Sequence, residues 1–393
     1  MANKQLIVSL VSDQTIPNVQ IIKHFWDENS EYLFITSDDM RSRNIDLHIK
    51  LAAGIEGESL YLEKDRENDT QYITKLLNEY NNFEKYEKII VNITGGTKIM
   101  SNATYAFFNN YNNVIIVYVD RNNKVLCLKG GDDFVMKPSI TVREFMLAYG
   151  NKCSDNSISG IDFEQTKLIY EAYKEINPLD YLEEFNILRE RRKAGRGLTD
   201  IQPIIKFIEK INYQPQQEGH LTKDEVKYLT GEWFEEYVYY TLKEELQLSD
   251  EQICIGIHLD TDRKIKHPTN PPIVEEELKL DNELDVVFVK NDALHTIECK
   301  TSVWNVIDES KIVDGNIIVE KKKVSILGET IYKSDSLQQR FGLKPMTNII
   351  TLTRFSEDPQ RFQKSLDRAN LSGIKIINGD MLDGKNKLSE LIK

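Results

Sequence analysis

The chain has 393 residues, which is more than one ordinary core needs and suits two domains. Hydrophobic residues make up 40% and aromatic residues 9% of it, a composition that excludes a wholly disordered chain. A formal net charge of −13 argues against non-specific nucleic-acid binding by the chain as a whole. No apolar run reaches the roughly eighteen residues of a membrane helix, and the first run breaks at Ser12-Asp13. We therefore expect a cytoplasmic protein with neither signal peptide nor membrane partner.

Cysteine and histidine usage limits the kinds of metal site. The four cysteines are Cys127, Cys153, Cys254 and Cys299. None pairs at C-x-x-C spacing and the six histidines are scattered, so neither a zinc site nor a disulfide framework is indicated. Any bound metal is expected to be a hard ion held by carboxylates. Basic clusters at 189–196, 263–267 and 320–323 are at least as typical of solvated surface as of nucleic-acid contacts.

From residue 1 to about 130, short apolar runs alternate with amphipathic stretches. The runs, each expected to form a strand, are QLIVSLV, YLFIT, SLYLE, KIIVNIT and VIIVYV. Between them apolar residues recur at helical spacing, as at Val19, Ile22 and Phe25. Alternating strands and helices predict a Rossmann-like α/β domain, a parallel sheet with helices on both faces. Ligands of such sheets bind beyond the carboxyl ends of the strands.

Two polar turns, SDQTIPN and NITGGTK, fall at such strand ends. Their candidate ligand residues are Ser12, Asp13, Gln14, Thr15 and Asn18 in the first turn and Asn92, Thr94, Gly95, Gly96, Thr97 and Lys98 in the second. Free backbone N–H groups at a helix start favour an anion, and Lys98 adds a point charge. The spacing is not that of a P-loop, because one residue separates Gly96 from Lys98. An ordinary turn with Thr97 as N-cap competes, but two turns at equivalent positions favour a ligand.

The second half of the chain has its own pattern. Residues 151–160 have a linker composition, and the segment from there to about 222 is mostly helical by periodicity. A helix with the apolar face Trp233, Phe234 and Val238 follows, with Thr230 as its expected N-cap. The stretch NELDVVFVKNDALHTIECKTS then predicts two strands joined by the turn at 290–292.

This strand pair carries a constellation of charged residues. Asp285 begins the first strand, and Glu298 and Lys300 lie two apart in the second, so these two share one face. An antiparallel hairpin can bring Asp285 beside Glu298, and a divalent cation relieves the repulsion between two such carboxylates. Lys300 can orient or deprotonate an attacking water whose pKa the metal lowers. The preceding Asp and the hairpin distinguish this pattern from an ordinary surface ion pair.

Further acidic candidates lie on the upstream helix, which carries Glu232, Glu235 and Glu236. Glu232 and Glu236 are four apart and share one face, but spacing alone does not choose among the three. Downstream, a helix ends at Gly342 and the apolar run NIITLT predicts another core strand. A helix, three strands, a helix and a strand make the αβββαβ core of restriction-endonuclease-like enzymes.

Five motifs together resemble one family over nearly the whole chain. LVSDQTIPNVQ and IIVNITGGTKIMS resemble the ligand loops of CARF domains, and TGEWFEEYVY, NELDVVFV and IECKT resemble the motifs of PD-(D/E)xK nucleases. The chain is therefore similar to the ancillary nucleases of type III CRISPR systems. The resemblance implies a CARF sensor domain over 1–150, a mainly helical linker over 151–222 and a restriction-endonuclease-like domain over 223–393.

The resemblance also implies partners and site residues. It implies a homodimer that binds cyclic tetra-adenylate at the two polar turns, with Thr36 as a further contact, and that cleaves single-stranded RNA and DNA with Mn²⁺ or Mg²⁺. The family pattern G-x-W-[LF]-E-x-Y favours Glu235. The implied catalytic residues are Glu235, Asp285, Glu298 and Lys300, and the implied metal ligands are Glu235, Asp285, Glu298 and the backbone carbonyl of Cys299. A long segment, 303–329, departs from the pattern.

Two other functions compete with this one. A CARF-domain transcription regulator would sense the same ligand, but it would carry a helix-turn-helix and would not need Asp285, Glu298 and Lys300 in register. A ring nuclease would degrade the cyclic activator in the CARF cleft without the C-terminal carboxylates. The activated nuclease is the function that the motifs favour.

Overall fold

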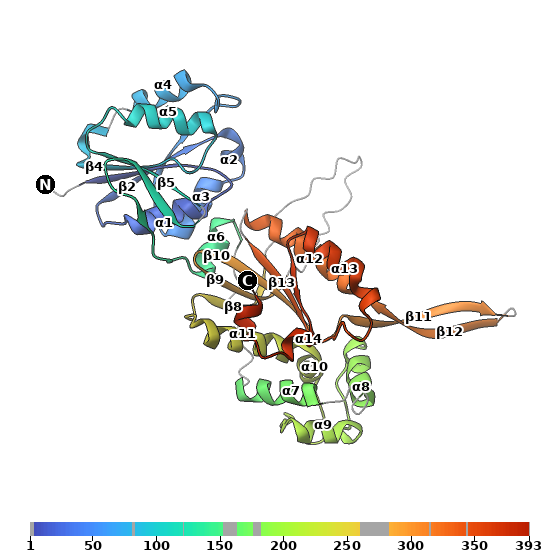
Figure 1. Ribbon diagram of the computed structural model, residues 1–393. Helices are drawn as coiled ribbons and strands as arrows, with labels where there is room; N and C mark the ends of the chain where they lie inside the picture. The colour runs from blue at the N-terminus through green and yellow to red at the C-terminus, as the bar shows by residue number, and fades with distance from the viewer. Residues whose placement is uncertain are drawn as a thin grey trace.

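The structure, a computed structural model, describes residues 4–80, 83–120, 122–151, 163–175, 182–259, 283–313, 316–342 and 345–392. Two large sheets, one from each half of the chain, organise the described residues, and a separate two-stranded sheet belongs to the second half (Figure 1). Most of the expected linker at 151–160 and the basic cluster at 263–267 lie outside the described residues. Among the helices described, none is long and apolar enough to span a bilayer.

The N-terminal sheet has seven strands in the order β3-β2-β1-β4-β5-β6-β7. The strands are β1 (Gln5–Leu10), β2 (Ser30–Thr36), β3 (Glu58–Tyr61), β4 (Lys88–Asn92), β5 (Val114–Val119), β6 (Lys124–Lys129) and β7 (Phe134–Val135). The five expected strands are confirmed, and they pair in parallel. The two others extend the sheet as an antiparallel edge, which the sequence analysis missed.

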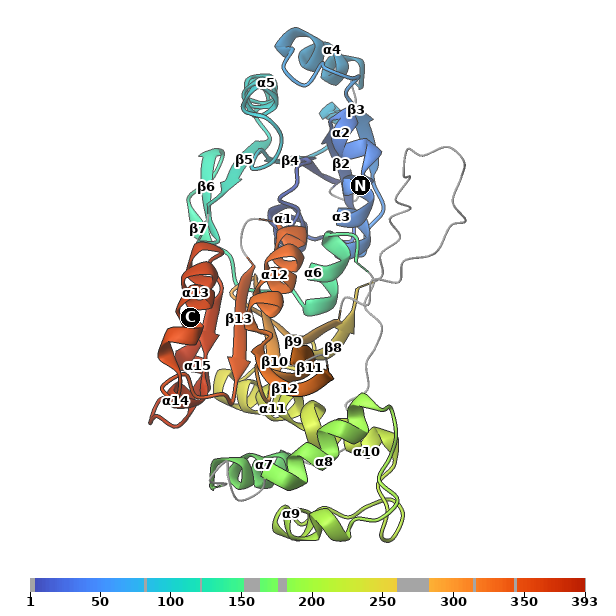
Figure 2. The same cartoon turned by 90° about the vertical axis from the view of Figure 1, so that its right-hand side faces the viewer.

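Helices cover both faces of this sheet, as expected of a Rossmann-like domain (Figure 2). The helices of this half are α1 (Ile16–His24), α2 (Asp38–Ser42), α3 (Ile45–Ala53), α4 (Thr70–Tyr80), η1 (Phe83–Lys85), α5 (Lys98–Phe108) and α6 (Val142–Ala148). Apolar residues of α4 and α5 pack on one face, and those of α1, α3 and α6 pack on the other. The strand side chains between them are almost fully buried, because a parallel sheet is covered on both sides.

The segment between the sheets is helical, as expected. It contains α7 (Phe163–Glu175), α8 (Leu182–Lys193), η2 (Gln202–Ile204), α9 (Ile205–Lys210) and α10 (Lys223–Lys227). A π-helical turn, η3 (Tyr228–Glu232), joins α10 to α11 (Trp233–Leu246) without a break. Thr230 is therefore not the N-cap of α11: its hydroxyl donates to the carbonyls of Val226 and Lys227 inside a continuing helix.

The C-terminal sheet has the order β14-β13-β10-β9-β8. Its strands are β8 (Ile253–His258), β9 (Glu283–Lys290), β10 (Ala293–Lys300), β13 (Met346–Thr351) and β14 (Lys375–Ile377). The predicted hairpin is confirmed, since β9 and β10 are antiparallel, but its turn is shorter than the expected 290–292 because Lys290 still pairs with Ala293. The two residues of the turn, Asn291 and Asp292, have φ values of 52° and 56°. Such a turn matches the twist of the flanking strands.

The remaining elements complete an αβββαβ core with one insertion. They are β11 (Trp304–Val313), β12 (Asn316–Ser325), α12 (Leu327–Gln338), η4 (Gln339–Phe341), α13 (Pro359–Leu371), α14 (Gly379–Leu382) and α15 (Leu388–Leu391). The departing segment is the antiparallel pair β11–β12, which projects away from the body of the molecule (Figure 1). The helix expected to end at Gly342 does so, with φ of 78° at that glycine.

The turn of the β9–β10 hairpin meets the N-terminal half directly. One oxygen of Asp292 accepts from the backbone N–H groups of Ser139 and Ile140, each at 2.9 Å, and the other accepts from Gln20 at 2.8 Å. Behind the turn, α6 and β9 share one apolar cluster, with Val142 of α6 among its members. The two halves are thus joined by buried contacts in addition to the linker.

Candidate active site and ligand loops

Asp285 and Glu298 face each other across the hairpin. The β9–β10 register runs to Ile297 opposite Val286, so Asp285 and Glu298 are the next pair along it. The backbone N–H of Cys299 donates to Asp285 at 2.7 Å. Both carboxylates are buried, with exposed fractions of 5% and 6%. Two acidic groups so close together in the interior require a positive charge.

Lys300 supplies that charge. Its Nζ lies 2.6 Å from a Glu298 oxygen, 3.5 Å from Asp285 Oδ2 and 3.2 Å from the carbonyl oxygen of Cys299. Three of the four predicted metal-binding groups therefore converge on one cation. A second lysine, Lys333 of α12, lies 3.2 Å from both oxygens of Glu298.

The protonation of these groups follows from burial and from each other. Burial and the neighbouring Glu298 raise the pKa of Asp285 to about 6, although Lys300 and the Cys299 N–H counteract them. Burial alone would lower the pKa of Lys300, but the Asp285 and Glu298 carboxylates raise it above its ordinary value. Lys300 therefore acts as the positive charge that offsets the two buried carboxylates.

The three glutamates of the preceding helix are separated by their partners. Glu232 pairs with Lys227. Glu236 is buried and accepts a hydrogen bond from the hydroxyl of Tyr228 at 3.0 Å. These contacts hold both side chains to the helical segment.

Glu235 is the glutamate that the hairpin charges affect most. Burial raises its pKa to about 9, and the next largest cause is the negative charge of Asp285, followed by that of Glu283. The positive charge of Lys300 lowers the same pKa. Glu235 therefore lies in the electrostatic environment of the hairpin carboxylates, as the motif pattern implied.

The donors fit a hard divalent ion by their chemistry, since they are carboxylate and carbonyl oxygens. In the described part of the chain, no group of three Asp, Glu, His or Cys side chains lies close enough together to hold a metal ion. The Lys300 ammonium accounts for this, because it contacts the oxygens of Asp285, Glu298 and Cys299 itself. Binding of a divalent ion at these oxygens requires the lysine to move aside.

The two ligand turns lie side by side at the switch point of the N-terminal sheet. They follow β1 and β4, which are parallel neighbours at the centre of the strand order. A Cβ at Gly95 would overlap the carbonyl oxygen of Leu10, so only glycine permits this close approach of the two chains. Thr97 is the N-cap of α5, accepting from the N–H of Met100 at 3.2 Å.

Some of the predicted ligand-binding residues are buried, and the two asparagines among them form hydrogen bonds with each other and with nearby backbone. Asn92 donates to Asn18 at 2.7 Å and accepts from the hydroxyl of Thr94 at 2.6 Å, and Asn18 donates to the carbonyl of Leu10 at 3.1 Å. Thr15 and Thr36, like both asparagines, are buried. The two asparagines hold the turns against each other.

Other predicted ligand-binding residues are at least partly exposed, and the charged ones are among them. The predicted ligand residues that are at least partly exposed are Ser12, Asp13, Gln14, Thr94, Gly96, Thr97 and Lys98. Asp13 is paired with Arg43, which neutralises the one acidic residue of the first turn. Lys98 begins α5 at the exposed edge of the second turn. The loops therefore present a cation and helix starts to solvent, which suits an anion.

Comparison with known proteins identifies both halves. Residues 6–145 match the model of the Card1 CARF domain, and residues 222–387 match that of the Card1-like endonuclease domain. The chain joins a Card1 CARF domain to a Card1-like endonuclease domain. The resemblance drawn from the five motifs is confirmed for both. No match was found among curated proteins.

Solved structures agree with this two-domain fold. Can2 from Sulfobacillus thermosulfidooxidans, in complex with cyclic tetra-adenylate, is 21% identical with a TM-score of 0.70, covering 99% of each chain. Protein VC1899 from Vibrio cholerae is 17% identical with a TM-score of 0.66, covering 96% of this chain and 95% of that one. A type III CRISPR defence DNA nuclease activated by cyclic oligoadenylate is 15% identical with a TM-score of 0.53, covering 89% of this chain and 46% of that one.

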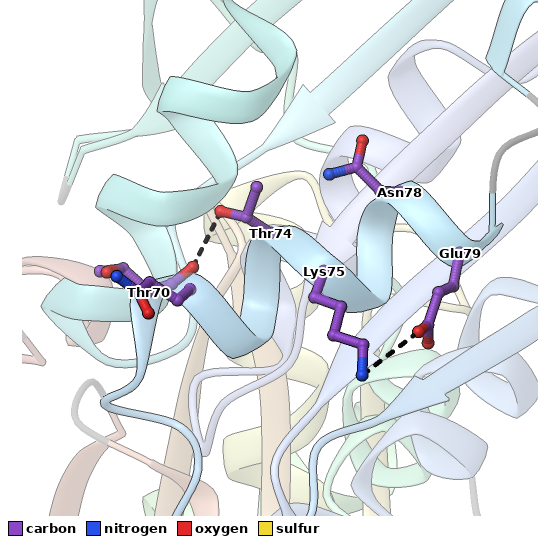
Figure 3. A pocket seen from close by; sticks show the side chains of 6 residues that line it. Thr70, Thr74, Lys75, Asn78 and Glu79 are labelled. Atoms are coloured by element: carbon purple, nitrogen blue, oxygen red, sulfur yellow. Dashed lines mark hydrogen bonds and ion pairs between the residues drawn. The ribbon is translucent and has the colours of Figure 1, made fainter.

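A hollow of about 510 Å³ on the CARF domain is lined by Thr70, Thr74, Lys75 and Asn78 with their neighbours, all from the single helix α4 (Figure 3). Lys333 is not among the site residues predicted from the sequence, because a lysine on a helix resembles any exposed lysine.

Proposed function

We propose that this chain is a homodimeric, metal-dependent nuclease of the PD-(D/E)xK type that acts in cytoplasmic type III CRISPR defence. Cyclic oligoadenylate, cyclic tetra-adenylate in particular, binds the CARF turns and activates cleavage of single-stranded RNA and DNA. The observation that carries the proposal is the convergence of Asp285, Glu298 and the Cys299 carbonyl on one cation. Residues 1–150 form the sensor, 151–222 the linker and 223–393 the nuclease.

The chemistry follows from the site. Glu235, Asp285, Glu298 and the carbonyl of Cys299 would hold Mn²⁺ or Mg²⁺, which supplies an activated water and neutralises phosphoryl charge. Lys300, displaced from the carboxylates by the metal, would donate a hydrogen bond to the phosphate that is cut or orient the attacking water. The bond broken is the P–O bond to the leaving strand.

The direct test uses purified protein with single-stranded RNA, single-stranded DNA and supercoiled plasmid, with Mn²⁺ or Mg²⁺ or with a chelator. Each substrate is incubated with and without cyclic tetra-adenylate. Cleavage that requires both metal and activator is the expected result. A protein that binds the activator and a DNA operator but cuts nothing would instead be a regulator, and this outcome would reject the proposal.

Lys98→Ala is expected to weaken cyclic tetra-adenylate binding and to raise the activator concentration needed for half-maximal cleavage. A lost charge-assisted contact is worth roughly 1.5–3 kcal/mol, and a symmetric dimer loses it twice. Isothermal titration measures the affinity, with Lys98→Arg as the matched control that keeps the charge. Equal affinity in Lys98→Ala and the unsubstituted protein would contradict the placement of the activator at this turn.

Lys333→Ala is expected to lower kcat by roughly 10- to 100-fold, the usual effect of removing a residue that orients a metal ligand. Lys333 contacts both oxygens of Glu298 and is only partly exposed. Lys333→Arg keeps the charge and should retain more activity. A metal titration belongs to the measurement, because lost orientation lowers kcat at saturating metal. An unchanged kcat would mean that Lys333 is only a surface ion-pair partner.

A further inference from the structure

A pocket of about 210 Å³ opens beside the catalytic strand. Thr301 and Ser302, the two residues after Lys300, form part of its wall. Leu352, just beyond β13, and Gly379, just beyond β14, line it as well. The pocket therefore lies at the carboxyl ends of three parallel strands, β10, β13 and β14, the usual place for ligands of such sheets.

The opposite wall comes from the helical segment between the domains. Tyr170, Tyr173 and Lys174 belong to α7, and Arg189 belongs to α8. The two domain matches end at residue 145 and begin again at residue 222, so both helices lie outside them. The pocket is thus built by the endonuclease domain together with two helices, α7 and α8, that belong to neither matched domain.

The lining combines aromatic rings with an excess of positive charge. Trp304 joins the two tyrosines, and the wall carries three basic side chains against two acidic ones, in a chain whose net charge is −13. One acid–base pair is internal, because Arg354 lies 2.6 Å from Asp383. Arg189 forms no ion pair with any residue that the structure describes. Lys174 is paired with Glu171 of its own helix at 3.7 Å. Aromatic surface next to an unpaired arginine is a combination that binds single-stranded nucleic acid.

We propose that this pocket receives one unstacked base of the single strand that is cut, with Arg189 bound to a phosphate next to that base. The proposal rests on the proposed nuclease function and adds a substrate-positioning subsite to it. The volume lies below the roughly 300–1,000 Å³ of pockets for drug-sized ligands, which suits one base. A base in a duplex must be unstacked before it can enter, so the pocket selects single strands over duplexes.

Binding without catalysis tests the proposal independently of cleavage. The anisotropy of a fluorescein-labelled single-stranded oligonucleotide is measured with cyclic tetra-adenylate but without divalent metal, at several salt concentrations. Arg189→Ala should raise Kd and reduce the salt slope by about one, the signature of a lost phosphate contact. Arg191→Ala is the matched control, because Arg191 is exposed on the same helix and does not line the pocket.

The aromatic half of the pocket is tested by a paired change in protein and substrate. Trp304→Ala should raise Kd by about five- to hundredfold, the range for one stacked base, whereas Trp304→Phe should retain most of the affinity. Thermal melting checks that each variant folds. An abasic site at one position should weaken binding to the unsubstituted protein and have little further effect on Trp304→Ala.

The outcomes of these experiments distinguish a failure of the pocket proposal from a failure of the proposed nuclease function. Equal Kd and salt slope for Arg189→Ala and Arg191→Ala would overturn the pocket, as would equal affinity of the unsubstituted protein for duplex and single strand. Loss of binding in Arg189→Ala would support it even if the protein cut no substrate once metal was added. In that last case the nuclease function would fail while the nucleic-acid subsite would stand.

Discussion

Glu298→Gln and Lys300→Ala are expected to reduce nucleic-acid cleavage by about 10³-fold or more while cyclic tetra-adenylate binding stays unchanged. Glu298 is buried and contacts both Lys300 and Lys333, so its charge holds both ammonium groups in place. Glutamine keeps the volume and one acceptor oxygen but removes the negative charge that holds a metal. The measurement is cleavage of single-stranded RNA and DNA, with activator affinity determined on the same preparations.

Glu298→Ala is a less informative variant, because it leaves two ammonium groups without their buried partner. Breaking a buried ion pair in this way costs roughly 3–5 kcal/mol, and a loss of activity could then reflect unfolding. Continued cleavage of single-stranded substrates by a folded Glu298→Gln protein would remove the hairpin from the mechanism. Continued breakdown of the cyclic activator alone would point to ring-nuclease activity in the CARF cleft.

The hairpin could be predicted from the sequence because its pattern leaves few alternatives. Alternating side chains place Glu298 and Lys300 on one face, and the two-residue turn at Asn291-Asp292 fixes the register that brings Asp285 opposite Glu298. The parallel strands of the CARF domain could be predicted equally well, since each is a short apolar run. In both cases local periodicity and tertiary burial favour the same structure.

The choice of Glu235 could not be made from spacing, because it depends on partners from other elements. Glu232 is occupied by Lys227 and Glu236 by Tyr228, and neither pairing has a sequence signature. The strands β6 and β7 were missed for a similar reason: short exposed edge strands lack a long apolar run. The family pattern favoured Glu235 among the three glutamates, a choice that spacing could not make.

The burial of Asn18, Thr15 and Thr36 was also beyond the sequence. Polar residues after a strand suggest contact with a ligand, yet the pairing of Asn18 with Asn92 uses those groups to join the two turns. The difference arises because β1 and β4 are adjacent, so their turns compete for the same space. A polar turn next to another polar turn satisfies part of its hydrogen bonding internally.

Asp292→Ala is expected to uncouple the sensor from the nuclease. Asp292 closes the hairpin whose other end carries Asp285, seven residues away, or about 23 Å along an extended strand. Its carboxylate accepts from two backbone N–H groups of the CARF domain and from Gln20, so the hairpin is a rigid connection between the ligand domain and the active site. Removing it should reduce the ratio of activated to basal cleavage by roughly 5- to 150-fold, the range of a typical coupling energy.

Asp292→Asn is the matched control. Asn tolerates the positive φ of this position as Asp does, and its amide oxygen can still accept from Ser139 and Ile140. A rotated Gln20 amide can accept from the new NH₂ group, so this variant should keep most of the activation.

The measurements are cleavage rates with and without cyclic tetra-adenylate, activator affinity by titration, and thermal melting to identify unfolded protein. A folded Asp292→Ala protein with normal activator affinity and the full activation ratio would contradict the model. The signal would then have to travel through the helical segment or a dimer interface, because the hairpin contact would be only structural.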